Sequence, residues 1–349
     1  MSGADLLAAT ALVTLLAYVL LAGADFGGGV WDLLATGPRA RAQRRLIEQA
    51  LAPVWEANHV WLIALVVILF TGFPLAFAVI STALHIPLTL VLLGIVLRGS
   101  AFVFRQYGDP DDRTALRWGR VFAVASVVTP VFLGVTLGAV TAEGIRVGDD
   151  GVPTTGFVAP WLGAFPFSVG LLALSAFAFL AATYLTVEAT DDALRDDFRR
   201  RALAAGVVTA LAAALAGALA WRGAPRFFGA LTGSGWSLPV LLGGALVLAG
   251  ALEALRRRAW TAARALAAGA VGLVVVGWGL AQRPYLVAPD LTVADAAAPP
   301  HIVRLTLWLL LVALVVVGPS LYVLLAVFKR QGATTQREAL EAGDEDSAP

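Results

Sequence analysis

The chain has 349 residues, of which 59% are hydrophobic and only 14% are charged, and its formal net charge is +1. A soluble domain of this length would need a larger charged surface, so the composition indicates a membrane protein. No basic patch interleaved with aromatic residues is present, which argues against nucleic acid as a partner. The lack of cysteine excludes disulfides, iron–sulfur clusters and thiolate metal ligands.

Nine apolar stretches of roughly 20 residues predict nine transmembrane helices. Their expected ranges are 6–24, 57–80, 83–103, 119–141, 160–187, 201–221, 237–254, 261–281 and 303–327. The N-terminus lacks a basic segment, so we expect the first stretch to be an anchor rather than a cleaved signal. The second stretch is the least regular, because Gly72, Phe73 and Pro74 interrupt it.

The basic residues predict the orientation of these helices. If the N-terminus is outside, 20 of the 25 lysine and arginine residues fall in the inner loops or at their edges. The sequence therefore predicts an all-α integral membrane protein whose C-terminus is cytoplasmic. Residues 1–330 are expected to form a single nine-helix domain, with the amphipathic segment 36–52 along the inner interface. Residues 331–349 are expected to form a disordered acidic tail.

The first predicted span ends in an acidic and glycine-rich run. Asp25 comes just before three consecutive glycines, Gly27 to Gly29, which allow another helix to approach the backbone closely. Asp25 either caps the end of a helix or carries protons inside the helix bundle. Spacing alone does not separate these two alternatives.

The second span opens with the run Trp55-Glu56-Ala57-Asn58-His59-Val60-Trp61. On a helix, Glu56 and His59 are three residues apart and can face one another, with Asn58 beside them. Ionisable groups at membrane depth are costly and often mark proton pathways, so this cluster suits a proton relay. In the alternative, the cluster lies among lipid headgroups and the two tryptophans form an interfacial belt.

Two arginines end the third span. Arg98 and Arg105 are seven residues apart and therefore share a helix face. We expect structural roles for both, in which their side chains reach the inner headgroups. Alternatively, Arg98 pairs with a buried carboxylate. Further along, Thr292 and Asp295 have the spacing of a capping box for a short helix in the outer loop 282–302.

The candidate haem ligands are few. The chain has three histidines, His59, His85 and His301, and one methionine, Met1. His85 precedes Pro87 near an outer boundary, where a structural histidine is expected. Haem ligation by two histidines needs side chains that face each other at membrane depth, so we expect this chain alone to bind no haem and no metal.

Five motifs in order along the chain together resemble subunit II of the cytochrome bd-type quinol oxidases. They are Gly23-Ala24-Asp25-Phe26-Gly27, the run from Pro53 to Trp61, the run from Arg98 to Arg105, Ala182-Thr183-Tyr184-Leu185, and the loop from Tyr285 to Pro299. The resemblance extends from residue 18 to about residue 327.

This resemblance implies a fold of two four-helix bundles plus a peripheral ninth helix, in a bacterial cytoplasmic membrane. It implies a partner, subunit I, that holds two b-type haems and a d-type haem. The complex would oxidise quinol and reduce dioxygen to water. The present chain would ligate no haem, support subunit I and line part of the proton path. A small accessory subunit and a quinone bound as a structural lipid are left open.

The resemblance also assigns roles to individual residues. Glu56 falls where the family has an acidic residue of the proton path, and Asp25 matches a second acidic position. Trp61 falls near a proposed oxygen route. Val103 stands where many relatives are acidic; if the inner half of the path uses that group, the path here differs or enters elsewhere. The competing hypotheses are a proton-coupled secondary transporter, whose symmetric broken helices are not evident here, and a purely structural subunit.

Overall fold

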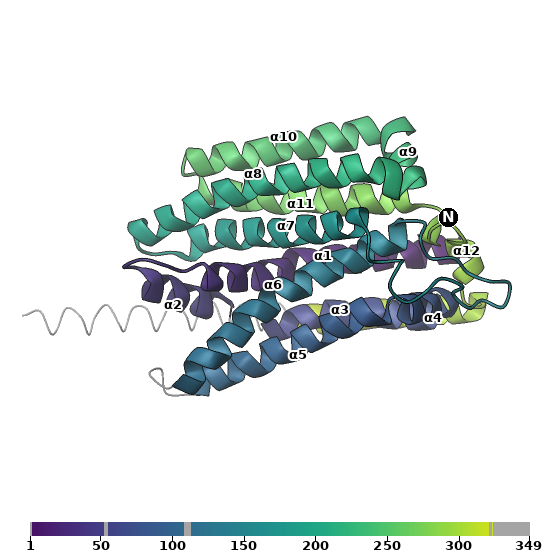
Figure 1. Cartoon of the computed structure of the whole chain (residues 1–349), viewed down its shortest axis with the longest axis horizontal. Helices are drawn as coiled ribbons and strands as arrows, with labels where there is room; N and C mark the ends of the chain where they lie inside the picture. Colours follow the sequence, from purple (N-terminus) through teal and green to yellow (C-terminus); the bar gives the residue numbers. More distant parts are fainter. Residues whose placement is uncertain (1, 52–54, 108–112, 321–322, 324–349) are drawn as a thin grey trace, which may run out of the picture.

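The computed structural model describes residues 2–51, 55–107, 113–320 and 323, and the side chains of residues 51, 55–57, 105–107 and 113–116 lie outside this description. Most of the described chain is α-helical, with the long helices side by side (Figure 1). The first helices are α1 (Gly3–Leu33), α2 (Ala40–Leu51), α3 (Trp55–Gly72), α4 (Pro74–Ala83), α5 (His85–Tyr107) and α6 (Arg113–Thr141). They are followed by α7 (Ala164–Glu188), α8 (Asp192–Gly223), α9 (Pro225–Gly233), α10 (Ser237–Arg256), α11 (Trp260–Gln282) and α12 (Val293–Ala296). A last helix covers Pro300–Ser320.

Within the described ranges, eight helices are long and apolar enough to cross a membrane, or nine if the bent pair of α3 and α4 is one span. The predicted all-helical membrane class is therefore confirmed. Several boundaries differ from the prediction; for example, α8 begins nine residues before residue 201. Helix α9 was not predicted at all. The predicted tail, residues 331–349, lies outside the described residues.

Helices α1 and α7 lie in the middle of the molecule. Helix α1 contacts α3, α6, α7 and α11, whereas α5 packs on α6, α7 on α8, and α10 on α11. Accordingly, α8, α10 and α11 lie on one side of α1 and α7, and α3 and α5 lie on the other (Figure 1). The central position of α1 places its polar residues inside the protein.

Helix α1 is longer than the predicted first span, because the glycine run does not end it. The helix continues to Leu33, so Asp25 lies in its interior and does not cap its end. The glycines are needed for packing: a Cβ atom on Gly27 would lie 1.9 Å from the carbonyl oxygen of Phe177 on α7. The Trp31 Nε1–H donates to the carbonyl of Ala178 over 2.8 Å, which is a second direct contact between α1 and α7. The two backbones thus touch directly where the sequence has no side chains.

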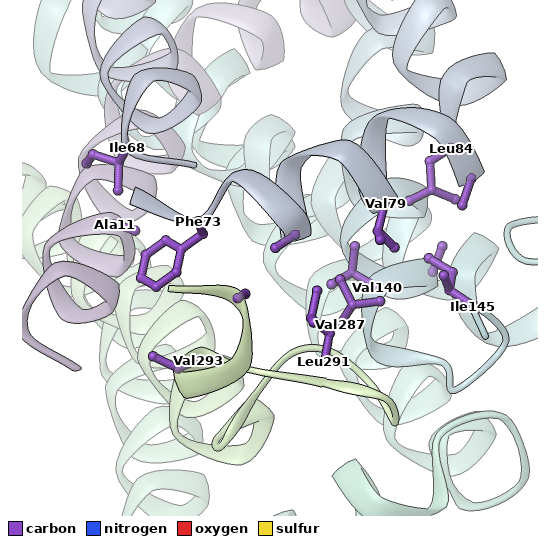
Figure 2. Packing of buried hydrophobic residues seen from close by; sticks show 14 of the residues in the cluster. Ala11, Ile68, Phe73, Val79, Leu84, Val140, Ile145, Val287, Leu291 and Val293 are labelled. Atoms are coloured by element: carbon purple, nitrogen blue, oxygen red, sulfur yellow. The ribbon is translucent and has the colours of Figure 1, made fainter. Parts of the chain in front are cut away.

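The predicted span 57–80 is not continuous, since α3 and α4 meet at an angle of 115°. Pro74 cannot donate a backbone hydrogen bond and begins a new helix. The Gly72 carbonyl at the end of α3 accepts from the Ala298 N–H over 2.8 Å. Figure 2 shows the apolar core around this bend, where α3, α4 and the segment after α11 meet. The labelled core residues are Ala11, Ile68, Phe73, Val79, Leu84, Val140, Ile145, Val287, Leu291 and Val293.

The connection between α11 and the last helix is ordered. Strands β1 (Tyr285–Val287) and β2 (Leu291–Thr292) pair antiparallel and lead into α12. Thr292 and Asp295 form a capping box at the start of α12, as their spacing predicts. Asp290 joins this segment to the loop after α6, because its carboxylate accepts from Arg146 Nε over 2.7 Å and from the Val147 N–H over 3.0 Å. Partial burial acts to raise the pKa of Asp290, but these contacts outweigh it and leave the pKa below its usual value.

Candidate functional site

A buried ion pair joins α1 to α5. The side chains of Asp25 and Arg98 are only 2% and 5% exposed. Arg98 Nη1 donates to Asp25 Oδ2 over 2.8 Å and Nη2 donates to Oδ1 over 2.6 Å, which makes the pair bidentate. Nη2 also donates to the Asp25 carbonyl over 3.1 Å. Of the two alternatives for Arg98, the structure therefore shows pairing with a carboxylate and not a side chain that reaches the headgroups.

The remaining surroundings of Arg98 come from α1 and α6. Its Nε donates to Ser126 Oγ over 3.0 Å, and Ser126 Oγ donates onward to the Phe122 carbonyl over 2.7 Å. The rings of Phe26 and Phe122 lie 4.9 and 4.8 Å from Arg98 Cζ. Three helices therefore hold one guanidinium group. Removal of either charge from such a pair leaves the other buried and uncompensated, which is costly.

A second polar position lies where α3 meets α1. Asn58 is fully buried, and its Nδ2 donates to the Leu21 carbonyl of α1 over 3.4 Å. Asn58 therefore faces α1 and not the lipid headgroups. Among the residues that the structure describes, Asn58 Oδ1 and the buried hydroxyl of Tyr18 have no hydrogen-bond partner. Buried polar atoms are almost always hydrogen bonded, so these two oxygens are unusual for the interior of a protein.

The other predicted site residues surround this seam between α1 and α3. Glu56 lies in the first turn of α3, but its side chain is outside the described part of the chain, as is that of Arg105. His59 and Trp61 are partly buried, and Trp61 packs against the apolar cluster that contains Tyr18 and Phe177. The structure thus places the first two turns of α3, with Asn58 and Trp61, against α1.

Sequence reasoning missed two polar neighbours of the ion pair. Tyr18 lies in electrostatic range of both Asp25 and Arg98. It precedes Asp25 by seven residues, so the helix period places it on the same face and could have identified it. Ser126 carries no such signal, because its contact with Arg98 depends on how α6 packs against α5.

Two further positions bear on cofactors and on the proton path. Val103 is 43% exposed, so an acidic side chain at this position would face outward from the chain. His85 and His301 are exposed, and His85 Nδ1 lies 3.0 Å from the Thr82 carbonyl. Across the described ranges, no group of three His, Asp or Glu side chains could hold a metal ion.

These features define the class of protein: a multi-pass helical membrane protein that keeps an ion pair and an amide away from lipid. The sequence narrows this class further. Residues 4–328 match the family model described as cytochrome bd terminal oxidase subunit II, so the chain belongs to that family. The predicted family is confirmed, and the chain is a multi-pass protein of the cytoplasmic membrane and a subunit of a terminal oxidase.

Individual relatives agree with the family. A protein of Bacillus subtilis provisionally named cytochrome bd menaquinol oxidase subunit II is 26% identical over 336 residues, which is 92% of this chain and 94% of that protein. Cytochrome bd-I ubiquinol oxidase subunit 2 of Escherichia coli K12 is 27% identical over 208 residues, which is 59% of this chain and 54% of that protein. A chain of the bd oxidase from Geobacillus thermodenitrificans has the same fold, with a TM-score of 0.77 at 21% identity over 94% of this chain and 99% of that one.

Proposed function

We propose that this chain is the haem-free subunit II of a bd-type oxidase that oxidises quinol and reduces dioxygen to water. The family match over residues 4–328 carries the proposal. The two b-type haems and the d-type haem would lie in subunit I and would supply the redox chemistry there. The exposed positions of His85 and His301 support this division, since a haem iron needs axial ligands that converge inside the protein.

We further propose a single transmembrane domain of nine spans over residues 1–330, with the N-terminus outside and the C-terminus in the cytoplasm. Helices α1, α3 with α4, α5 and α6 would form one four-helix bundle, and α7, α8, α10 and α11 the other. The packing of α1 on α3 and α6 and of α5 on α6 supports the first bundle, and the packing of α7 on α8 and α11 and of α10 on α11 supports the second. Helices α1 and α6 also pack on α7, where the two bundles meet. The last helix, Pro300–Ser320, would be the peripheral ninth, because only 11% of its apolar stretch is buried.

Subunit I would cover the side of the molecule that α3 and α5 form. Both helices expose apolar side chains on this side. These are Val60, Ile63, Val66, Val67 and Phe70 on α3, with Leu92, Leu93, Val96, Leu97, Val103 and Phe104 on α5. The same α3 carries Asn58, His59 and Trp61, which places the candidate proton path next to this surface. An acidic side chain of the partner could then take the place of the acidic residue that many relatives have at the position of Val103.

The proton path would run along the start of α3 through Glu56, Asn58 and His59. An electron that enters a buried site attracts a proton, because uncompensated charge in a low dielectric is expensive. Asp25 lies beside this path as a charge held by Arg98, since both of its carboxylate oxygens accept from the guanidinium. For Asp25 to carry a proton itself, the ion pair would have to open. Trp61, packed against the cluster around Tyr18, would border the oxygen route.

A purely structural subunit is the second candidate function. The observation in its favour is the same ion pair, which joins α1, α5 and α6 whether or not protons move past it. The two candidates differ in what they require of Glu56. A proton path needs an exchangeable proton at this position, and a structural role needs only a side chain of the same shape.

The test is Glu56→Gln in the assembled oxidase, because glutamine keeps the shape but cannot transfer a proton. We expect haem content to stay unchanged and oxygen consumption per haem to fall about a hundredfold, the lower end for loss of a proton-transferring group. Glu253→Gln is the matched control, since Glu253 is half exposed and pairs only with Arg256 and Arg257 among the described residues. Normal turnover of a fully assembled Glu56→Gln enzyme would remove Glu56 from the path and favour the structural role.

A further inference from the structure

A polar cavity lies where the connection between α1 and α2 meets the first turns of α8. Its volume is about 280 Å³. Six of the residues that line it are polar: Thr36, Arg39, Gln43, Asp197, Arg200 and Arg201. The cavity is separate from the candidate proton path, because none of its lining residues belongs to α3 or α5.

The cavity carries an excess of positive charge. Asp197 is its only acidic lining residue among those described, and three of the lining residues are arginines. Asp197 Oδ2 accepts from Arg39 Nε over 2.8 Å and from Gln43 Nε2 over 2.9 Å. Asp197 Oδ1 accepts from Arg39 Nη2 over 2.7 Å and from Arg200 Nη2 over 2.9 Å. Each oxygen of the Asp197 carboxylate thus accepts two hydrogen bonds. The cavity lining has three guanidinium groups and one carboxylate, which leaves a formal excess of two positive charges.

One nitrogen of the Arg201 guanidinium group has no acceptor among the described residues. Its Cζ lies 5.5 Å from the Trp31 ring and 5.3 Å from the Phe198 ring, which limits how the guanidinium plane can turn. Its Nη2 donates to Gln43 Oε1 over 2.8 Å. Its Nη1 is buried and has no hydrogen-bond partner in the part of the chain that the structure describes. A buried donor without an acceptor is costly, so this position favours a ligand with acceptor oxygens.

We propose that the cavity binds a phosphate group, and that the source of this phosphate is the headgroup of an anionic phospholipid. Guanidinium forks match the geometry of phosphate oxygens better than other cations do. Basic pockets between helices at the cytoplasmic membrane surface are typical sites for anionic headgroups. Leu33 and Leu34 end α1 just before the lining residue Thr36 and are about half exposed, so acyl chains would have an apolar surface to follow. A soluble phosphate would satisfy the same donors but would not use these leucines.

A lipid in this cavity would join the end of α1 and α2 to the start of α8. The protein itself already makes this connection through Arg39, Gln43 and Asp197. The phosphate would neutralise the charge that these contacts leave over. We therefore expect the lipid to raise the thermal stability of the complex as well as to bind.

Native mass spectrometry of the intact, delipidated oxidase tests the proposal. The probes are phosphatidylglycerol, phosphatidylcholine and inorganic phosphate, each added at the same concentrations. We expect the wild type to retain phosphatidylglycerol in preference to phosphatidylcholine. Arg201→Gln should weaken this binding about tenfold, which is the loss expected for one charge-assisted hydrogen bond. Arg200→Gln should weaken it severalfold, and it preserves the fold because the Arg200 side chain is 67% exposed.

Arg257→Gln is the matched control. Arg257 is an exposed arginine that pairs with Glu253, and the adjacent Arg258 contacts Asp196 of α8 over 2.9 Å, which places the control at the same end of the molecule. Its lipid binding should equal that of the wild type. Binding of inorganic phosphate that is lost in Arg201→Gln, without selective retention of phosphatidylglycerol, would support the phosphate site and overturn the lipid as its source. If the wild type, Arg201→Gln and Arg200→Gln retain phosphatidylglycerol equally, and also retain inorganic phosphate equally, the site itself is overturned. Arg200→Gln decides the question if Arg201→Gln does not assemble.

Discussion

At the scale of single residues, the Asp25–Arg98 pair has the largest effect on how this chain can work. A carboxylate that shuttles protons needs to lose and regain its charge, whereas Asp25 is held by two hydrogen bonds from a guanidinium group and is shielded from lipid and water. The pair supplies a fixed arrangement of charge beside Asn58 and the start of α3. Within the proposed proton path, we therefore assign the mobile proton to Glu56 and His59 and not to Asp25.

We predict that Asp25→Asn lowers the amount of assembled oxidase. Loss of the carboxylate leaves the Arg98 charge buried without a partner, which costs about 3–5 kcal/mol. The measurement is haem content per membrane protein and the thermal unfolding of the purified complex. Asp192→Asn is the control, because Asp192 is 86% exposed and its pair with Arg195 contributes at most about 1 kcal/mol.

The double variant Asp25→Asn with Arg98→Gln separates structure from turnover. It removes both charges, so assembly should recover relative to Asp25→Asn alone. If oxygen consumption per haem is then normal, the pair acts only in assembly. A double variant that assembles but turns over slowly would show that the charge itself assists proton transfer. Equal assembly of Asp25→Asn and the wild type would contradict the structural role.

The sequence predicted this region in part. Asp25, Asn58 and Arg98 stand out as polar residues in apolar runs, but the sequence left the depth of Asn58 open and favoured an Arg98 side chain that reaches the headgroups. Composition and spacing did not show that Arg98 pairs with Asp25, since the two residues are 73 positions apart and meet only through the packing of α5 on its neighbours. Ser126 escaped notice for the same reason. Long-range pairing depends on the rotation of each helix about its axis, which a single sequence does not specify.

At the scale of the elements, α1 packs closely on α7 at Gly27, two residues after Asp25 of the ion pair. We predict that Gly27→Ala destabilises the complex severely, because the added Cβ would lie 1.9 Å from a backbone carbonyl oxygen on α7, which cannot move without displacing the helix. Overpacking of this kind typically costs about 1–3 kcal/mol or more. The measurement is the yield and the unfolding temperature of the assembled oxidase.

Gly217→Ala is the matched control for this prediction. Gly217 also lies inside a helix, but a Cβ at this position would meet nothing within 4 Å. The substitution should be neutral or slightly stabilising, since alanine favours helix more than glycine does. If Gly27→Ala were as stable as Gly217→Ala, the two backbones would not be in contact as described.

The sequence predicted the helices better than their ends. Apolar runs indicated where helices cross the membrane, and the interruption at Gly72, Phe73 and Pro74 indicated the position of the bend between α3 and α4. The prediction still treated 57–80 as one span, because hydropathy measures burial in an apolar medium and not the direction of the chain. It also ended the first span too early, since glycines that usually weaken helices serve here for contact with α7.

At the scale of the whole molecule, the proposed division of labour is one in which a partner subunit holds the redox groups. Its apolar helices keep a few polar groups near α1 and α3, and the side proposed to face subunit I is lined by valine, leucine, isoleucine and phenylalanine. In a membrane, such an apolar surface can face either lipid or a partner helix. The redox groups would then lie on the partner's side of this contact, close to the proton path but not coordinated by this chain.

We therefore predict that this chain, expressed without subunit I, contains no haem, whereas co-expression of both subunits yields a complex with the absorption of b-type and d-type haems. The physical reason is that His85 and His301 are exposed and cannot enclose an iron atom between them as they stand. The measurement is haem per polypeptide by the pyridine haemochrome method. His85→Ala and His301→Ala should leave the haem content of the complex unchanged. Stoichiometric haem on the isolated chain, lost on either substitution, would identify that histidine as a ligand and would assign redox chemistry to this subunit.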